Sequence, residues 1–395
     1  MTRSTLVVAV LIALPRLAAA QAATGSDAAV PPPSVDKAPP VAASTPPPRA
    51  DQEGPLDRAF SWHPFGFLRM QYIAVQNDPN VAFVGRDDGF ELQNARVGMR
   101  GDLGLRASFV IAIDGAVDER QINTPQGKIG VGLRDAFMDV RLSGPMMVRG
   151  GYFLAWVDPE ALVPDTSREF VDHPIESRGM RSTEGWYTPG LPPGRSMGAA
   201  IHLDPAEPTS GAAVGYEVAV QNGADEFSAN NDNDQPAVSA AGVLRLPHEG
   251  YVIAAVRWNP RTVGQLPFRQ DETDYQGTLG AHMVAGPLSL GAGLIVQRTI
   301  FESTGGPAQD AFGAHAQLLF RFGGDDHPLA VGYRFGILDP SSLITTDRVM
   351  EHTVGAVMGV PSYRMRVQIQ ATHVEEQAER ELSNDRIQLA AEVSL

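Results

Sequence analysis

The chain has no cysteine, and Lys37 and Lys128 are its only lysines among 31 basic residues. The lack of cysteine excludes a disulfide framework, so stability must come from a closed hydrogen-bonded sheet or from a large core. The net charge of -15 argues against nucleic acid as a partner. We expect the acidic excess on exposed loops and along a water-filled interior, although ordinary solvated surface charge would also account for it.

Long hydrophobic runs are missing as well. Beyond the N-terminus, Arg, Gln, Asp or Gly interrupts the apolar segments every second or third residue. A spanning helix needs about 20 mostly apolar residues. If the chain enters a membrane, it must therefore do so as a closed β-barrel.

The N-terminus has the features of a secretory signal peptide. The basic start at Arg3 is followed by an apolar run over residues 5–14 and by Ala18-Ala19-Ala20. The run is too short for a membrane anchor and is interrupted by Pro15 and Arg16. We expect a signal peptide over residues 1–20 and, after its cleavage, localisation in the cell outer membrane of a Gram-negative bacterium.

The next segment differs in composition from the rest of the chain. Residues 21–56 are rich in Pro, Ala, Ser and Thr and lack the apolar content of a core. This composition predicts a disordered Pro/Ala-rich spacer, with a periplasmic or cell-wall contact as an alternative role. The barrel is expected over residues 57–395.

From Trp62 onward the dominant pattern is an alternation of apolar and polar residues in segments of about ten residues. The clearest case is the segment 363–372, where one face is apolar and the other holds Arg, Gln and Thr. This period predicts β-strands and excludes an α or α/β fold, although a soluble sandwich would also alternate. Sixteen strands are expected, near residues 65–75, 90–101, 104–114, 129–141, 146–154, 196–204, 212–221, 237–247, 250–259, 275–285, 288–299, 310–323, 328–337, 350–360, 362–373 and 386–395.

The connections between these segments alternate in length. Tight turns at residues 101–104, 143–145, 286–287 and 360–361 are each followed, one strand later, by a longer polar loop. Short periplasmic turns and long external loops are typical of outer-membrane barrels, and a sandwich has no reason to alternate them. The last segment reaches the final residue and is expected to pair with the first strand. The predicted fold class is an all-β, transmembrane antiparallel β-barrel.

Several short blocks resemble the phosphate-selective porin O and P family, and they occur in that family's order. They cover residues 90–104, 133–139, 148–153, 218–223 and 256–260. The resemblance implies a trimeric passive channel with an arginine-lined lumen for small anions and a third external loop folded inward as a constriction. The chain departs from the family at Gln93 and Asn94, where paired arginines are usual, and it lacks the family's lysine cluster.

The longest connection, residues 155–195, carries acidic residues and arginines together. Folded into the lumen, it would place mixed charge opposite the wall, where a narrow low-dielectric passage concentrates the field. A solvated external loop is the alternative. The candidate constriction residues are Asp158, Glu160, Arg168, Glu169, Asp172, Arg178 and Arg181.

Arginines on the polar faces of the strands are expected to point into the lumen, because facing hydrocarbon would cost roughly 2 to 4 kcal/mol at the midplane. Whether they form a conducting ladder or pair with lumenal acids such as Asp114 and Glu392 stays open. The candidate pore-lining residues are Arg96, Arg100, Arg106, Arg149, Arg257, Arg321, Arg334, Arg364, Arg366 and Arg386.

No catalytic, cofactor or metal site is expected. The G-x-S-x-G match at 194–198 precedes a strand-like segment, whereas the nucleophile elbow needs a helix there. The polar run 230–234 lacks the glycine and distal glutamate of a calcium loop, and the nine histidines show no metal spacing. We expect a porin for passive diffusion of small hydrophilic solutes, weakly anion-selective, in contact with outer-membrane lipid. A structural or adhesive barrel with a plugged lumen is the alternative, and an outer-membrane hydrolase is a distant third.

Overall fold

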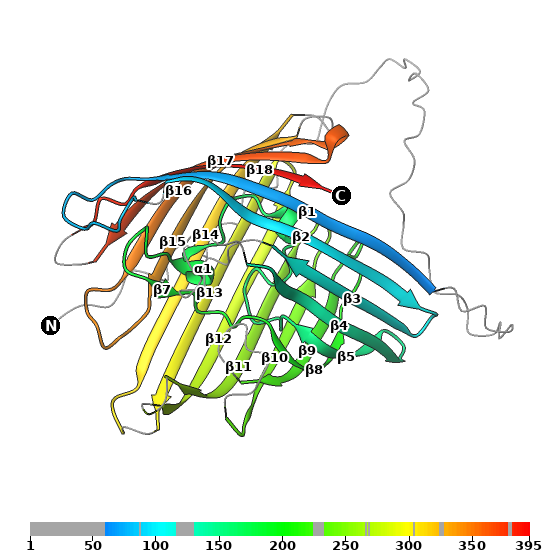
Figure 1. Cartoon of the computed structure of the whole chain (residues 1–395). Helices are drawn as coiled ribbons and strands as arrows, with labels where there is room; N and C mark the ends of the chain where they lie inside the picture. Colours follow the sequence, from blue (N-terminus) through cyan, green and yellow to red (C-terminus); the bar gives the residue numbers. More distant parts are fainter. Residues whose placement is uncertain are drawn as a thin grey trace, which may run out of the picture. The chain divides into compact units, whose positions relative to one another are not determined.

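The structure is a computed structural model, and sixteen of its strands form one closed antiparallel barrel (Figure 1). It describes residues 60–395 except 87, 116–129, 224–232, 265–266, 268, 303–304, 324–327 and 378–380. The expected signal peptide and spacer, residues 1–20 and 21–56, lie outside the described residues. The prediction of a sixteen-stranded antiparallel barrel is confirmed.

Each wall strand pairs with its neighbours in the sequence, so the barrel is a simple meander. Strand β5 pairs with β8, because two short strands, β6 (Gly179–Met180) and β7 (Thr188–Pro189), belong to the connection between them. The wall consists of β1 (Phe60–Val75), β2 (Gly89–Leu103), β3 (Ala107–Asp114), β4 (Gly132–Ser143), β5 (Met146–Phe153), β8 (Ser196–Leu203), β9 (Ala213–Asn222), β10 (Pro236–Arg245), β11 (Tyr251–Val263), β12 (Gln270–Ala285), β13 (Leu288–Phe301), β14 (Gln309–Phe322), β15 (Leu329–Asp339), β16 (Val349–Val360), β17 (Met365–Glu376) and β18 (Arg386–Ser394).

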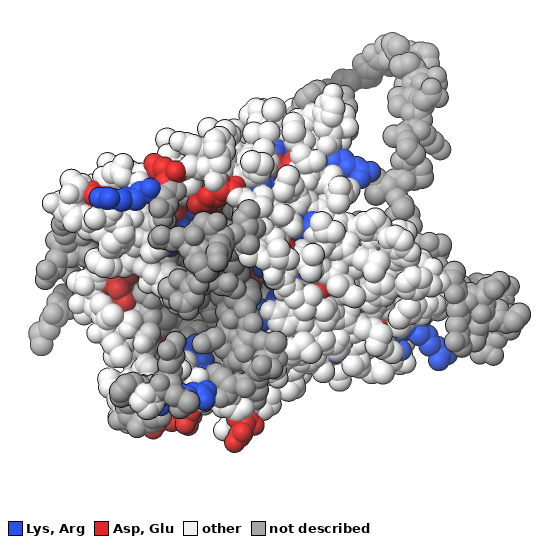
Figure 2. Space-filling model, in the orientation of Figure 1, with Lys and Arg blue, Asp and Glu red and all other residues white. Residues whose placement is uncertain are grey.

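Alternation along the strands places polar residues inside and apolar residues outside. In β18, Arg386, Gln388 and Glu392 are buried, whereas Ile387 and Leu389 between them are exposed. An apolar outer surface around a polar interior is the arrangement that a barrel in lipid requires. Figure 2 shows a mostly uncharged face, with charged groups gathered mainly toward its ends.

The last strand closes the barrel against the first. The register of β1 with β18 runs from Phe67 opposite Ser394 to Val75 opposite Arg386, and the Leu395 N–H donates to the Gly66 carbonyl at 2.9 Å. Closure leaves the sheet without an open edge. Among the described residues, no helix is long and apolar enough to span a membrane.

Two predicted wall arginines lie in turns, which corrects the sequence-based strand boundaries. Arg106 follows Gly104, whose φ is +67°, and precedes the start of β3. Arg364 has a left-handed φ of +49° at the end of a short 3-10 helix, η2 (Pro361–Tyr363), and β17 begins only afterwards. The alternation of apolar and polar residues continues through both turns in the sequence, so the pattern alone did not show that the strands end there.

Residues 154–195, called the inward loop below, connect β5 to β8 and fold inside the barrel, where Figure 1 shows α1 (Ile175–Arg178) within the ring of strands. Ile175 packs with Met180 against Leu338 and Val374 of the wall. A Cβ at Gly336 would lie only 3.0 Å from the Ile175 side chain, so glycine gives the helix room beside the wall. The loop therefore occupies the lumen as a packed element.

Candidate functional site

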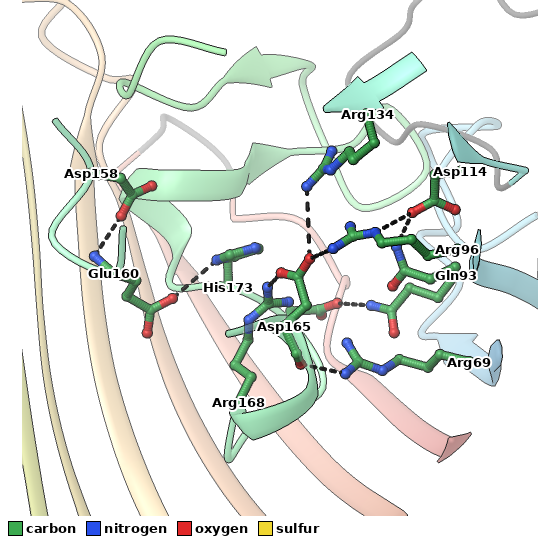
Figure 3. A network of polar contacts seen from close by, with 12 residues as sticks. Arg69, Gln93, Arg96, Asp114, Arg134, Asp158, Glu160, Asp165, Arg168 and His173 are labelled. Atoms are coloured by element: carbon green, nitrogen blue, oxygen red, sulfur yellow. Dashed lines mark hydrogen bonds and ion pairs between the residues drawn. The ribbon is translucent and has the colours of Figure 1, made fainter. Parts of the chain in front are cut away.

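Asp165 in η1 (Asp165–Ser167) lies at the centre of a polar network between the inward loop and the wall (Figure 3). Its carboxylate pairs with Arg96 of β2 at 2.5 Å, lies 3.9 Å from Arg134 of β4, and pairs with Arg168 of the same loop. Arg96 also contacts Asp114 of β3 at 3.3 Å. The network thus joins the loop to neighbouring strands on one side of the barrel.

The surroundings shift the pKa values of two nearby loop aspartates, Asp165 and Asp158, in opposite directions. Burial alone would raise the pKa of Asp165, but Arg168, Arg96 and Arg134 outweigh burial and hold that pKa well below its usual range. Burial raises the pKa of Asp158, which accepts a hydrogen bond from the Glu160 N–H at 2.7 Å. Asp165 therefore stays ionised, whereas burial disfavours the charged form of Asp158.

Wall side chains on the other side of η1 bind backbone carbonyls of the loop. Arg69 of β1 donates to the Asp165 carbonyl at 2.6 Å. Arg366 and Gln368 of β17 donate to the Arg168 carbonyl at 2.6 and 2.9 Å. Arg69 and Arg366 both also pair with Glu392 of β18, at 2.8 and 3.0 Å. These contacts fix the loop's path as well as its charge.

A second ionic group holds the part of the loop that follows α1. Arg178 pairs with Glu184 of the loop at 2.7 Å and with Glu351 of β16 at 2.5 Å, and Arg386 of β18 pairs with Glu351 at 2.8 Å. All four side chains are buried. Burial would raise the pKa of Glu184, but Arg178, Arg386 and Arg181 lower it. We call Arg178, Glu184, Glu351 and Arg386 the latch.

Two cavities lie beside the inward loop. The narrow cavity, about 270 Å³, has Arg96 and Arg134 of the wall on one side and loop residues on the other, among them Asp158, Glu160, Asp165 and His173. His173 Nδ1 lies 3.0 Å from a Glu160 oxygen. The wide cavity, about 1140 Å³, lies between residues 186–196 and the β11–β14 wall and is lined by Arg257, Asn259, Gln297 and Thr299.

Of the ten predicted pore-lining arginines, the eight on wall strands have different surroundings. Arg149 pairs with Asp139 at 2.8 Å, Arg321 with Glu169 at 2.6 Å, and Arg334 donates to the Asp172 carbonyl at 2.9 Å. Arg100 lies over the Phe65 ring, and Arg257 has no hydrogen-bond or ion-pair partner among the described residues. Arg96, Arg366 and Arg386 belong to the loop contacts above. Most of the predicted ladder is thus engaged with acids or carbonyls.

The remaining predicted loop residues also contact the wall or each other. Asp172 accepts a hydrogen bond from Gln370 of β17 at 3.3 Å, and Arg181 pairs with Glu91 of β2 at 3.1 Å. The structure therefore brings the candidate loop residues against the strands, as an inward fold requires.

Sequence reasoning did not single out Arg69 or Arg134 as pore-lining. For Arg134 the reason is an irregularity in the strand. Arg134 is the extra residue of a β-bulge, since Ala112 pairs with Asp135 and Ile113 with Leu133. Gln93 is the extra residue of a second bulge, and it donates to the Val171 carbonyl of the loop at 3.2 Å. A bulge re-aims a side chain and breaks the alternation that would have identified it.

The structure offers no support for the weaker chemical motifs. Ser196 of the G-x-S-x-G match donates to the Asn222 carbonyl at 2.9 Å and begins a strand. Within the described residues, no group of three or more His, Cys, Asp or Glu side chains is arranged to hold a metal ion. Residues 230–232 of the polar run lie outside the described residues.

Comparison with known proteins gives a match in fold. The sequence matches no known family profile, and no curated protein is similar to it in sequence. Similar solved structures include an anion-selective porin from Comamonas acidovorans (14% identity, TM-score 0.60, 85% of this chain and 100% of that one). Others are the outer membrane channel DcaP of Acinetobacter baumannii (12%, 0.59, 85% and 97%) and the trimer form of OmpT, an outer membrane protein of Vibrio cholerae (10%, 0.56, 85% and 100%).

These comparisons define the class of the fold. The chain has the sixteen-stranded antiparallel barrel of outer-membrane porins. The neighbours themselves are described as a porin, a channel and an outer membrane protein.

Proposed function

We propose that the protein is a passive channel in the outer membrane of a Gram-negative bacterium, admitting small hydrophilic solutes with a weak preference for anions. The observation that carries the proposal is the narrow cavity, where loop carboxylates face wall guanidinium groups inside a porin-like barrel. Such a constriction sets ion preference because the nearest charges act within one Debye length, about 8 Å at physiological salt. Resemblance to the phosphate-selective porin O and P family and a homotrimeric state belong to the same proposal.

The balance of exposure around the narrow cavity supports a preference for anions over cations. Asp165 is engaged by Arg96, Arg134 and Arg168, and its side chain is 17% exposed. The Arg134 side chain is 24% exposed, and its 3.9 Å separation from Asp165 is the longest of these contacts. A permeating ion therefore meets a guanidinium more readily than the carboxylate that partly neutralises it. Acidic residues at the loop tips have little influence on an ion inside the barrel, because salt screens charges that lie more than one Debye length away.

Replacing Arg134 with glutamine tests this directly. The substitution removes the most exposed positive charge in the Asp165 network, so the chloride preference should fall or reverse while the channel still conducts. The measurement is the reversal potential in a potassium chloride gradient across a planar bilayer. Arg298→Gln is the matched control, because Arg298 is 61% exposed on the outer face of β13. A wild-type channel that prefers potassium would contradict the proposed anion preference and leave the barrel untouched.

One observation favours the alternative of a plugged structural barrel. The inward loop binds strands on several sides of the lumen, through Arg96, Arg334, Gln370 and Glu351. If these contacts hold the loop across the whole lumen, the protein would conduct no ions. Conductance of the purified protein separates the two functions.

A further inference from the structure

Strand register brings polar side chains together on the inner face of β11, β12 and β13, beside the wide cavity. The residues that alternate with them, such as Trp258 and Tyr275, are exposed on the outer face. The inward side chains form two adjacent rows across the strands, and we call them the polar floor: Arg257, Gln276 and Gln297 in one row, and Asn259, Asp274 and Thr299 in the other.

Arg257 is the free positive charge of the polar floor. Its guanidinium makes no hydrogen bond or ion pair with any residue that the structure describes. The acid beside it, Asp274, is already engaged, because Arg261 lies 2.9 Å away and the Thr299 hydroxyl donates to it at 2.6 Å. A guanidinium presents its N–H donors in a planar fork that matches a carboxylate. Arg257 is therefore available to an anionic group in the wide cavity.

Two buried side-chain oxygens of the polar floor are acceptors that lack a donor. Asn259 is 3% exposed and Gln276 is 6% exposed, and neither amide oxygen has a hydrogen-bond partner in the described part of the chain. Gln276 is held in place by its Nε2, which donates to the Leu191 carbonyl of the inward loop at 2.7 Å. A buried acceptor without a donor is costly. A hydroxyl group of a bound solute would supply the missing donor.

The loop side of the wide cavity is largely apolar and aromatic. It includes Trp186, Tyr187, Pro189 and Leu191, which face the polar floor across about 1140 Å³. A few oriented polar groups opposite an apolar surface are typical of sites for small organic molecules. An inorganic anion would use the guanidinium alone, whereas a carbon skeleton would also pack against this loop side.

We propose that the wide cavity binds a hydroxylated organic acid of the sugar-acid class. The carboxylate binds the Arg257 guanidinium, hydroxyl groups donate to the Asn259 and Gln276 oxygens, and the C–H faces pack against the loop side. The inference deepens the proposed channel function and rests on it for the route by which the solute crosses the membrane. Binding itself requires only the folded barrel and its inward loop.

Equilibrium dialysis of radiolabelled gluconate against the refolded full-length protein in detergent tests the proposal. Saturable binding at one site per chain is expected. Sorbitol has the hydroxyls of gluconate without the carboxylate, and hexanoate has a carboxylate without the hydroxyls. Each should compete at least about 10-fold more weakly than unlabelled gluconate, because each leaves part of the polar floor without a partner.

Variants of the polar floor assign the contacts. Arg257→Gln should weaken gluconate binding by about 10- to 100-fold, the usual range for hydrogen bonds to a charged group, and Arg257→Lys should restore part of it. Asn259→Ala should weaken gluconate binding by about 3- to 10-fold and leave competition by hexanoate unchanged. Arg298→Gln is the matched control, because Arg298 is exposed on the outer face of β13, and it should bind gluconate as the wild type does.

Heat-modifiable gel mobility establishes that each variant is folded. The proposal is overturned by wild-type protein that shows no saturable gluconate binding, or by folded Arg257→Gln that binds gluconate as the wild type does. Competition by sorbitol or hexanoate as strong as that by gluconate overturns the assigned class of solute. Dialysis does not depend on conduction: protein that binds gluconate but passes no current contradicts the channel function alone, and protein that conducts without binding gluconate overturns this inference alone.

Discussion

The latch offers the sharpest test of how the inward loop is held in the lumen. Arg178→Met removes a guanidinium that lies between Glu184 and Glu351, at 2.7 and 2.5 Å, and keeps the side chain's approximate length. Both carboxylates stay buried beside Arg386, which lies 2.8 Å from Glu351 but 3.7 Å from Glu184. The substitution thus leaves one buried carboxylate poorly compensated while the barrel wall is unchanged.

The expected size of the effect follows from this burial. Breaking a buried ion pair by removing one partner costs about 3 to 5 kcal/mol. When the loop leaves the lumen, water again solvates Glu184. The substitution therefore makes the free energy of loop docking less favourable by this amount. Since 1.4 kcal/mol is a tenfold change, the population of the undocked loop should rise by roughly 10² to 4 × 10³-fold.

Limited trypsin digestion measures this population, because cleavage tracks the open form when opening and closing are fast. Cleavage after Arg168, Arg181 and Arg195 should accelerate in the variant. Arg298→Met is the control: its partner Asp310 is 3.8 Å away and both are more than half exposed, so the change should be under about 1 kcal/mol. Equal digestion of Arg178→Met and wild type would refute the view that the latch holds the loop.

Two further predictions concern the contacts around η1. Because Asp165 has a depressed pKa when docked, its contribution to docking is full above about pH 4 and is lost as pH falls through the docked value. Emission from tryptophan, including the buried loop residue Trp156, should therefore differ between wild type and Asp165→Asn already at pH 7. Identical acid titrations of the two proteins would contradict this. Arg366→Gln should alter single-channel conductance because it loses contacts with Glu392 and the Arg168 carbonyl, while Arg364→Gln should not, and equal effects would count against the turn position of Arg364.

Much of the wall could be predicted from the sequence, because lipid imposes a strict pattern. Outward positions must be apolar and every backbone group must be paired, so alternation and loop length identify strands directly. The prediction was less accurate at the long-loop ends: β12 begins at Gln270 and not near residue 275. The added residues are polar and charged, and an alternation rule based on lipid contact gives no signal for them.

The site was harder to predict, for reasons that particular residues show. Arg134 and Gln93 lie in bulges, where alternation fails. Asp165 was not distinguished from the other acids of the long loop, because two of its three arginine partners, Arg96 and Arg134, come from distant strands. Spacing along the chain predicts contacts within a strand or turn, whereas these sites depend on how separate strands align.

Conductance of the purified full-length protein in a planar bilayer tests the proposed channel function most directly. We expect discrete, ohmic single-channel steps in potassium chloride, since the narrow cavity beside Asp165 is lined by charged groups. Protein that is folded by heat-modifiable mobility and inserts into the bilayer, but gives no steps above the bare membrane, would contradict the channel function and favour the plugged barrel.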